Sequence, residues 1–369
     1  MADKLFGRTG AACLAGLLVF ATPAEACTSI LLSAADGTPV YGRTMEYAIA
    51  IQPDVVVIPR NYRYVGTRPS GMQGIAWTSR YAVVGVMSFG EPFVADGMNE
   101  KGLAGGGLYL PGYVGYSTPK GANPQKSVAP WEFLTWALTN FATVQEVKDA
   151  VADNKMSIID IPAPIINFTL PLHFTLHDAT GASIVIEPVD GKLKIYDNPL
   201  GVLTNSPTFD WHLTNIRNFV KISAVDAGPL KIAGKTFLPL GQGSGLLGIP
   251  GDPTPPSRFI RALAYVQSVK QLPDGPQTVR LAEHVMNNFD IPVGFIRTAS
   301  EGGDLEYTQW TTIADLRARK YYLKSYQDEV FRGVDLMSFD LDAKSLRIAP
   351  FKENLTPPPM NFSASAKTP

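Results

Sequence analysis

The chain has 369 residues, of which 45% are hydrophobic and 18% are charged, and its formal net charge is −1. This near-neutral balance argues against a nucleic-acid or membrane-surface partner, because both attract strongly basic surfaces. The length suits one large domain or two small ones, and the 33 glycines and 30 prolines indicate the many turns of a sheet-rich fold.

The first 26 residues have the three parts of a secretory signal peptide. A positive start is followed by an uncharged apolar run at 11–21 and by Ala-Glu-Ala at 24–26, where a signal peptidase needs small residues. The apolar run is too short to span a bilayer, and no later run is long enough. We therefore expect residues 1–26 to be removed and the mature protein, exported to the periplasm or secreted, to begin at Cys27.

Cys27 is then the single cysteine of the mature chain, because Cys13 leaves with the signal. A lone thiol in an oxidising compartment is either modified, buried or reactive. A lipid anchor on Cys27 is one interpretation, but lipoprotein sites have a leucine three residues before the cysteine, where this chain has Ala24. An inert core cysteine is the second interpretation.

The third interpretation is an N-terminal nucleophile. After cleavage Cys27 carries both a thiol and a free α-amine, whose pKa of about 7.7–8.0 leaves a useful fraction unprotonated at neutral pH. The amine can take the thiol proton directly or through one water, so the nucleophile needs no histidine. The cysteine by itself does not decide among the three interpretations.

Asp36-Gly37 indicates a tight hairpin between strands at 28–32 and 40–45. A two-residue turn pairs residues whose numbers sum to 73, which places Glu46 opposite Cys27 and lets its carboxylate bind the α-amine. Strict alternation puts Arg43 and Glu46 on opposite faces. In this register, both reach the thiol only if a bulge or strand end intervenes, and we expect one near Gly42.

The remaining pattern predicts strands in runs, with helices between the runs and no strict βαβ alternation, which favours an α+β fold with antiparallel sheets. The tail from Thr356 to Pro369 is expected to be loose. Strands are predicted at 55–58, 81–87, 172–177, 183–187, 192–196, 306–313, 319–326 and 329–336, and helices at 131–141, 144–154, 210–220, 257–269 (with Ser257 as cap) and 278–289.

Two other kinds of site are excluded by their context. The glycine cluster GLAGGGLYLPG at 102–112 is not followed by a helix, as a phosphate-binding loop requires. His173 and His177 are four residues apart on one strand face, but no further ligand completes a metal set. We interpret these two, His212 and His284 as structural or solvated, and we expect neither a metal nor a cofactor.

Four blocks follow the N-terminal Cys-Thr in order, and together they resemble the choloylglycine hydrolase family of penicillin V acylases and conjugated bile salt hydrolases. The similarity extends from Cys27 to about Leu341, so we expect a signal peptide at 1–26, an amide hydrolase domain at 27–341 and a C-terminal extension at 342–369. The blocks are YGRTMEY (41–47), DGMNEKGLAGGGLYLPGY (96–113), VLTNSPTFDWHLTNIRNF (202–219) and GIPGDPTPPSRFIRA (248–262).

The resemblance implies the N-terminal nucleophile hydrolase fold, with two stacked antiparallel sheets between helical layers. It also implies a reaction, the hydrolysis of linear amide C–N bonds through a thioester, and a role for six residues. Cys27 is the implied nucleophile, Arg43 favours its thiolate, Glu46 replaces an aspartate that binds the α-amine, Asn205 and the main-chain N–H of Tyr109 donate to the oxyanion, and Arg258 supports the site.

The substrate is left open by the sequence. A tyrosine at 109 is typical of penicillin V acylases, and Met45 suits an apolar pocket, so we favour phenoxyacetyl or fatty-acyl amides. Bile salts and acyl-homoserine lactones are the alternatives, and a non-catalytic, lipid-anchored binding protein is the alternative of another class. Residues 221–247 resemble the arm that forms tetramers in the family, which predicts a homotetramer.

Overall fold

The computed structural model describes residues 26–68, 74–87, 90–120, 122–163, 166–298, 303, 305–356 and 359–360. The expected signal peptide lies outside the described residues except for Ala26, and so does most of the expected loose tail. No helix in the described part of the chain is both long and apolar enough to cross a membrane.

The first of two large antiparallel sheets, here called the β1 sheet, has a β-hairpin of residues 27–47 at its centre. Nearly every residue of this hairpin is buried on both faces, as expected for strands at the centre of a layered fold. In spatial order its strands are β14 (Val202–Leu203), β1 (Cys27–Ser33), β2 (Pro39–Tyr47), β18 (Leu305–Asp315), β19 (Lys320–Ser325) and β20 (Arg332–Asp335), with β17 (Ile296–Arg297) paired to β18.

The second sheet, here called the β8 sheet, stacks against the first. Part of the stretch expected as a C-terminal extension joins it, since Arg347–Ala349 pairs with Val55–Val57. In spatial order its strands are β13 (Lys192–Asp197), β12 (Ser183–Val189), β11 (Leu172–His177), β8 (Ala104–Tyr109), β7 (Val94–Asn99), β6 (Val83–Met87), β3 (Asp54–Ile58) and β21 (Arg347–Ala349).

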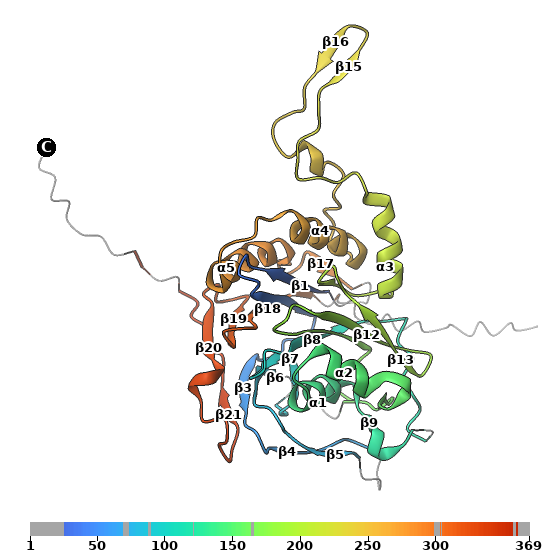
Figure 1. The fold of residues 1–369 in the computed structure, drawn as a ribbon, viewed down its shortest axis with the longest axis vertical. Coiled ribbons are helices and arrows are strands. Elements are labelled where there is room, and N and C mark those ends of the chain that lie inside the picture. Colours follow the sequence, from blue (N-terminus) through green and yellow to red (C-terminus); the bar gives the residue numbers. More distant parts are fainter. Residues whose placement is uncertain are drawn as a thin grey trace, which may run out of the picture.

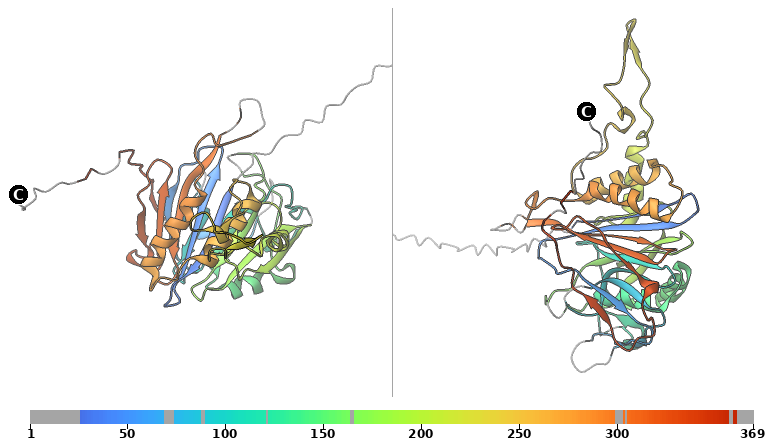
Figure 2. Two further views of the ribbon diagram at one scale, coloured as in Figure 1. Left: turned by 90° about the horizontal axis from the view of Figure 1, so that it is seen from above. Right: turned by 90° about the vertical axis from the view of Figure 1, so that its left-hand side faces the viewer.

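Helices cover the outer face of each sheet, so the molecule has four layers (Figures 1 and 2). α4 (Pro255–Ser268) and α5 (Gly275–Met286) pack on the β1 sheet, and α1 (Phe133–Asn140) and α2 (Val144–Val151) pack on the β8 sheet. Three apolar cores fill the spaces between successive layers. The predicted α+β architecture of two stacked antiparallel sheets between helices is confirmed.

Several strands were not among those predicted, notably the two central strands β7 and β8, and one helix cap was wrong. β7 and β8 lie in the block at 96–113, where the many glycines weaken the strand pattern. α4 begins at Pro255 with Thr254 at its N-cap, whereas Ser257 already lies inside the helix and donates to Asp252. The error arises because a proline at the first helical position is as strong a start signal as a polar cap.

The predicted register of the central hairpin is wrong by one residue. Cys27 pairs with Met45, so paired numbers sum to 72, and Glu46 is not opposite Cys27. The turn has three residues instead of two, because Gly37 takes a left-handed conformation with φ +81° and Ala34 pairs with Thr38. A slip of one residue exchanges the two faces of a strand.

The corrected register removes the need for the bulge expected near Gly42. Pairing is continuous through Ile30 and Gly42, and the irregularity lies instead in β18, between Thr308 and Trp310. Cys27 and Arg43 now share the face toward the β8 sheet. Glu46 lies on the opposite face, beneath the helices, as strict alternation from Arg43 predicts.

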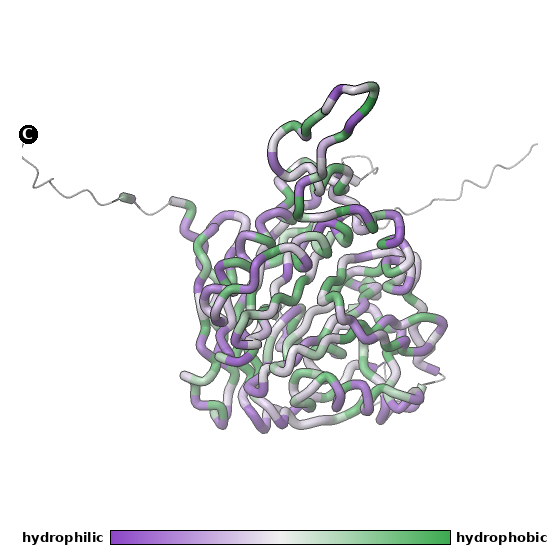
Figure 3. The backbone as a smooth tube through the Cα atoms, turned by 45° about the horizontal axis from the view of Figure 1, so that its top comes forward, coloured by the Kyte–Doolittle hydropathy of each residue, from purple (hydrophilic) through white to green (hydrophobic). Residues whose placement is uncertain are grey.

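Residues 221–247 form an arm that projects away from the four layers (Figure 1). The arm follows α3 (Phe209–Asn215) and a 3₁₀ turn at Ile216–Phe219, and its tip is the hairpin of β15 (Leu230–Ile232) and β16 (Lys235–Phe237). It carries hydrophobic segments along its length (Figure 3). Its exposed large apolar side chains are Val225, Leu230, Ile232, Phe237, Leu238, Leu240 and Leu247.

Candidate active site

Cys27 begins β1 and is 2% exposed, with its sulfur on the face toward the β8 sheet. The guanidinium of Arg43 reaches this sulfur directly, since Nη2 lies 3.4 Å from Sγ. Burial lowers the pKa of Arg43, but the charges of Cys27 and Asp96 outweigh burial and leave the pKa raised. A permanently charged guanidinium beside a thiol favours the thiolate.

Arg43 is held in place by Asp96, a residue of β7 that the sequence analysis did not single out. Nη1 of Arg43 donates to Asp96 Oδ2 at 3.4 Å and to the carbonyl of Ala95 at 3.0 Å, and both charged side chains are fully buried. Asp96 also accepts hydrogen bonds from Trp310, Thr312 and Tyr321 of the β1 sheet. The ion pair therefore joins the two sheets.

One glycine of the cluster at 105–107 makes room for this arginine. A Cβ on Gly106 would lie 2.7 Å from the Tyr41 hydroxyl and 3.2 Å from Arg43. A side chain there would push the sheets apart at the point where Arg43 crosses between them. Close packing between the sheets therefore explains this glycine, and no phosphate-binding loop is needed to explain it.

An apolar cavity of about 100 Å³ opens beside the thiol. Met45 lines it, and its sulfur lies 3.4 Å from Nη2 of Arg43. The only charged side chain among the described lining residues is Glu91. Aromatic and aliphatic side chains from the β8 sheet and the segment before α1 form most of the wall, among them Tyr109, Trp131, Leu172 and Phe174.

The main-chain nitrogen of Cys27 has a different set of neighbours. It donates to Oδ1 of Asn205 at 2.7 Å, and Nη2 of Arg258 donates to the same oxygen at 2.6 Å. Nδ2 of Asn205 donates to the carbonyl of Tyr109 at 2.8 Å, which leaves the second hydrogen of that amide for another acceptor. Two donors on Oδ1 and an acceptor at Nδ2 fix the orientation of the amide.

Arg258 is 1% exposed, although it lies in the first turn of α4. Besides Asn205, its guanidinium donates to the carbonyl of Cys27, to Thr28 Oγ1 at 2.8 Å and to the carbonyl of Pro253 at 2.8 Å. These bonds anchor the start of β1. Burial lowers the pKa of Arg258, and the charges of Glu46, Cys27 and Glu306 oppose that shift.

Two buried carboxylates lie on the same side as Arg258. Glu46 accepts from Thr308 at 2.7 Å, and burial raises its pKa to about 8. Glu306 is two residues from Thr308 on the same face of β18, and burial raises its pKa to about 7, opposed by the backbone N–H of Ala26 and the charge of Arg258. Sequence reasoning missed Glu306 because only the pairing of β18 with β2 brings this carboxylate near Ala26, the residue before Cys27.

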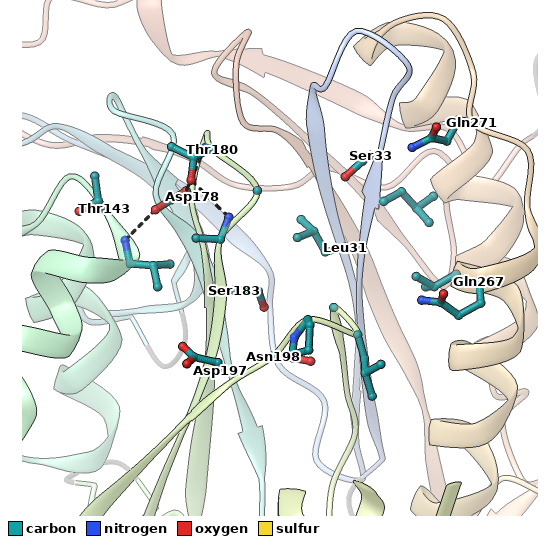
Figure 4. A pocket seen from close by; sticks show the side chains of 18 of the residues that line it. Leu31, Ser33, Thr143, Asp178, Thr180, Ser183, Asp197, Asn198, Gln267 and Gln271 are labelled. Atoms are coloured by element: carbon teal, nitrogen blue, oxygen red, sulfur yellow. Dashed lines mark hydrogen bonds between the residues drawn. The ribbon is translucent and has the colours of Figure 1, made fainter.

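A larger cleft lies at the other end of β1. It has a volume of about 740 Å³ and is lined by Leu31 and Ser33, by Asp178 and Ser183 around the β11–β12 turn, and by the end of α4 (Figure 4). Six residue steps along the strand, about 20 Å, separate Cys27 from Ser33. This cleft is therefore not the site of thiol chemistry.

The structure brings the six other predicted site residues to the neighbourhood of Cys27. Arg43 and the pocket residues Met45 and Tyr109 lie on the sulfur side, while Glu46, Asn205 and Arg258 lie on the nitrogen side. Tyr109 is placed by its pairing with Leu172. The donation of its main-chain N–H to an oxyanion stays a prediction.

The layered sheets, with a cysteine at the start of a central strand, define the class: an N-terminal nucleophile hydrolase fold. The model of the family "Linear amide C-N hydrolases, choloylglycine hydrolase family" matches residues 27–349, and the chain belongs to this family. It is therefore an enzyme that hydrolyses linear amide C–N bonds.

Curated relatives and solved structures agree with this assignment. The chain is 36% identical over 334 residues to a bile salt hydrolase/transferase of Clostridium perfringens, covering 89% of this chain and 98% of the relative. It is 28% identical to a penicillin V acylase of Pectobacterium atrosepticum, over 85% and 79% of the two chains. A crystal structure of a conjugated bile acid hydrolase variant from Clostridium perfringens superposes with a TM-score of 0.80 and 34% identity, covering 91% and 100%.

Proposed function

We propose that the mature protein begins at Cys27 and hydrolyses amides of small apolar acyl groups through a thioester on that residue. The observation that carries this proposal is the placement of the two reactive atoms. The sulfur of Cys27 lies 3.4 Å from the Arg43 guanidinium, and the nitrogen lies 2.7 Å from Asn205 Oδ1. The family match also begins at Cys27.

In this mechanism the α-amine of Cys27 takes the thiol proton, and the thiolate attacks the amide carbonyl. Its hydrogen bond to Asn205 Oδ1 holds the amine while its lone pair accepts the proton. The developing oxyanion receives the second N–H of the Asn205 amide and the main-chain N–H of Tyr109. The C–N bond then breaks as the protonated α-amine returns its proton to the leaving amine.

Water completes the cycle. The α-amine, again neutral, removes a proton from a water molecule that attacks the thioester carbonyl. Collapse of the second tetrahedral intermediate breaks the C–S bond, releases the carboxylic acid and restores the thiol. Arg43 stabilises the sulfur as it leaves with a negative charge.

The cavity beside the thiol favours substrates whose acyl group is aromatic or fatty, such as phenoxyacetyl. Its volume of about 100 Å³ is below the roughly 300–1,000 Å³ typical of sites for drug-sized ligands. Its walls are almost entirely apolar, which suits the acyl part of the substrate and leaves the amine part outside. Penicillin V is the corresponding test substrate.

Conjugated bile salts are the second candidate. The observation in their favour is that the bile salt hydrolase/transferase relative is more similar to this chain, at 36% identity, than the penicillin V acylase relative, at 28%. A bile salt would place its steroid rings in the cavity. That requires the walls, including Trp131 and Leu172, to move apart.

The test compares hydrolysis of penicillin V, glycocholate and a long-chain acyl-homoserine lactone by wild type and by Cys27→Ser. We expect the wild type to prefer penicillin V and the variant to lose at least about 10³-fold in kcat/KM. Hydrolysis of glycocholate alone would favour the second candidate. Equal rates of hydrolysis by the two proteins would show that the thiol takes no part in the mechanism.

Export is part of the same proposal, since signal cleavage creates the amine. We propose a periplasmic or secreted protein with a free Cys27. The competing possibility is a lipid-anchored binding protein, in which acylation of the same residue removes the free amine. The intact mass of the purified mature protein separates them, because residues 27–369 without additional mass leave the amine free, and an acyl adduct blocks it.

We also propose that the arm at 221–247 docks on further copies of the chain to form a homotetramer. Its exposed apolar side chains, including Leu238, Leu240 and Leu247, are unusual for a surface that faces only water. Sedimentation at micromolar concentration tests the proposal. A monomer at that concentration would contradict it.

A further inference from the structure

Two buried histidines donate to successive carbonyl groups of the strand end that carries Asn205. Nε2 of His173, on β11, lies 2.9 Å from the carbonyl of Thr204. Nε2 of His212, on α3, lies 2.9 Å from the carbonyl of Asn205. Because a carbonyl only accepts, each Nε2 carries the hydrogen. Both histidines are fully buried, and the proposed reaction uses neither as an acid or base.

The environment of His212 keeps its ring neutral and fixed. Burial lowers its pKa to about 4, with the carbonyl of Asn205 opposing the shift and His173 and Arg258 adding to it. The ring stacks on Phe259 of α4, with centroids 4.5 Å apart and planes 8° apart. A neutral, stacked imidazole offers one N–H in one direction, which is what a positioning contact needs.

His173 is fixed by Glu187, a buried carboxylate on β12. Oε1 of Glu187 lies 3.1 Å from Nδ1 of His173 and also accepts from the backbone N–H of Phe209 at 2.9 Å. Phe209 is the first residue of α3, the helix that carries His212. The two histidine contacts thus belong to one buried network that spans β11, β12 and α3.

The loop held by this network ends at the site. The side-chain amide of Asn205 contacts Cys27, Arg258 and the Tyr109 carbonyl on one side. Its own carbonyl is bound by His212 on the other. Thr204 is tied as well, through its hydroxyl, to the carbonyl of Pro255 at the start of α4. Backbone and side chain of Asn205 are therefore constrained independently.

We propose that His173 and His212 are positioning residues that clamp the Thr204 and Asn205 carbonyls, so that the Asn205 amide meets the oxyanion without reorganising. The inference rests on the proposed thioester mechanism, in which Asn205 is an oxyanion donor. A preorganised donor contributes through its placement, so loosening the loop reduces transition-state stabilisation while Cys27 and Arg43 stay in place.

His212→Phe is the variant that tests the clamp, because phenylalanine retains the stack on Phe259 but lacks the N–H. We expect kcat for the preferred amide to fall about 10- to 100-fold, with KM close to wild type. Alkylation of Cys27 by iodoacetamide forms no oxyanion at Asn205, so its rate should change less than twofold. His212→Gln, which returns an N–H near Nε2, should recover part of kcat.

His284→Gln, an exposed change on α5, is the matched control and should behave as wild type. The clamp is refuted if folded His212→Phe retains kcat within twofold of wild type. It is also refuted if alkylation falls in parallel with hydrolysis in either His212 variant, since that pattern means general loss of structure. Failure of the proposed function would be distinguishable from failure of the clamp, because wild type and Cys27→Ser would then hydrolyse the amide at the same rate.

Discussion

The two faces of the β1–β2 hairpin present different charged groups near the two reactive atoms of Cys27. On the face toward the β8 sheet, the sulfur meets the cation Arg43 and an apolar cavity. On the face toward the helices lie two acids, Glu46 and Glu306, and a single guanidinium, Arg258. The first face suits a thiolate and the second suits an ammonium group.

This difference shows how one residue can serve as both nucleophile and base. The strand itself separates the two environments, because its alternation sends neighbouring side chains to opposite faces. Each environment can then be tuned without disturbing the other. We therefore expect different effects from substitutions on the sulfur face, from substitutions on the nitrogen face and from changes in parts of the molecule that belong to neither face.

The largest effect is expected on the sulfur side. Arg43→Met removes the cation beside Sγ, and loss of an opposite charge this close typically moves a titration by 1–3 units. We expect the alkylation rate of Cys27 at pH 7 to fall about 100-fold, with its pH midpoint shifted upward. Iodoacetamide kinetics across pH measure both.

Two further variants control for the buried charge that Arg43→Met leaves behind. Arg43→Met/Asp96→Asn removes the unpaired carboxylate and should fold better while showing the same shifted midpoint. Arg280→Met, at an exposed arginine of α5, should match wild type. An unshifted midpoint in the double variant would show that Arg43 does not act on the sulfur.

A smaller and opposite effect is expected on the nitrogen side. A carboxylate beside the α-amine stabilises its ammonium form and raises its pKa, and the reaction needs the neutral amine. Glu306→Gln should therefore lower that pKa and move the acidic limb of kcat/KM to lower pH by about 1 unit. Glu283→Gln on α5 is the control, and superimposable profiles for all three proteins would exclude Glu306 from the amine site.

Stability should also depend on whether the amine is present. With Ala26 retained, burial raises the pKa of Glu46 to about 8 and of Glu306 to about 7, from an ordinary value of 4.5. The folded chain then binds more protons than the unfolded chain across that window, so its stability falls as pH rises from about 5 to 8. An α-ammonium group offsets this loss.

The measurement for this prediction is Tm at several pH values for the chain starting at Cys27 and for one that retains residues 25–26. Apart from Glu25 and the displaced α-amine of the longer protein, the titrating groups are the same in both proteins. We expect the mature protein to gain at least about 3 °C over the longer one between pH 5 and 8. If the difference in Tm between the two proteins does not change with pH, the amine does not neutralise Glu46 and Glu306.

The smallest catalytic effect is expected from the arm, which touches neither face. Asp226 accepts from the N–H of Gly243 at 2.6 Å, so the arm can be cut between them and residues 227–242 replaced by two glycines. We expect sedimentation as a monomer, with kcat/KM within about threefold of the full chain and both pH limbs unchanged. A shift in either limb of the pH profile of kcat/KM would show that assembly through the arm affects the sulfur face or the nitrogen face of the hairpin.

The sequence predicted the architecture and the set of site residues better than their arrangement. Long apolar runs such as 172–177 and 183–187 were found as strands, and the family blocks identified the residues that gather around Cys27. The hairpin register failed because Gly37 adds a residue to the turn through one dihedral angle. No local pattern in Asp36-Gly37 distinguishes the two turn lengths.

The contacts of residues that reach the site only through the fold could not be predicted from the sequence. Asp96 lies in a quoted block, but its contact with Arg43 depends on the stacking of two sheets. His212 was interpreted as structural or solvated, and its bond to the Asn205 carbonyl depends on how α3 returns to β14. Glu306 is far from Cys27 in the sequence, and only the pairing of β18 with β2 brings it to the N–H of the adjacent residue, Ala26.

In the proposed mechanism one residue supplies both the attacking sulfur and the proton acceptor. Intact mass spectrometry of wild-type enzyme, acid-quenched during turnover of penicillin V, tests this most directly. We predict a chain of residues 27–369 that carries one phenoxyacetyl group on Cys27. An active enzyme that retains residues before Cys27, or that carries the acyl group on another residue, would contradict the account.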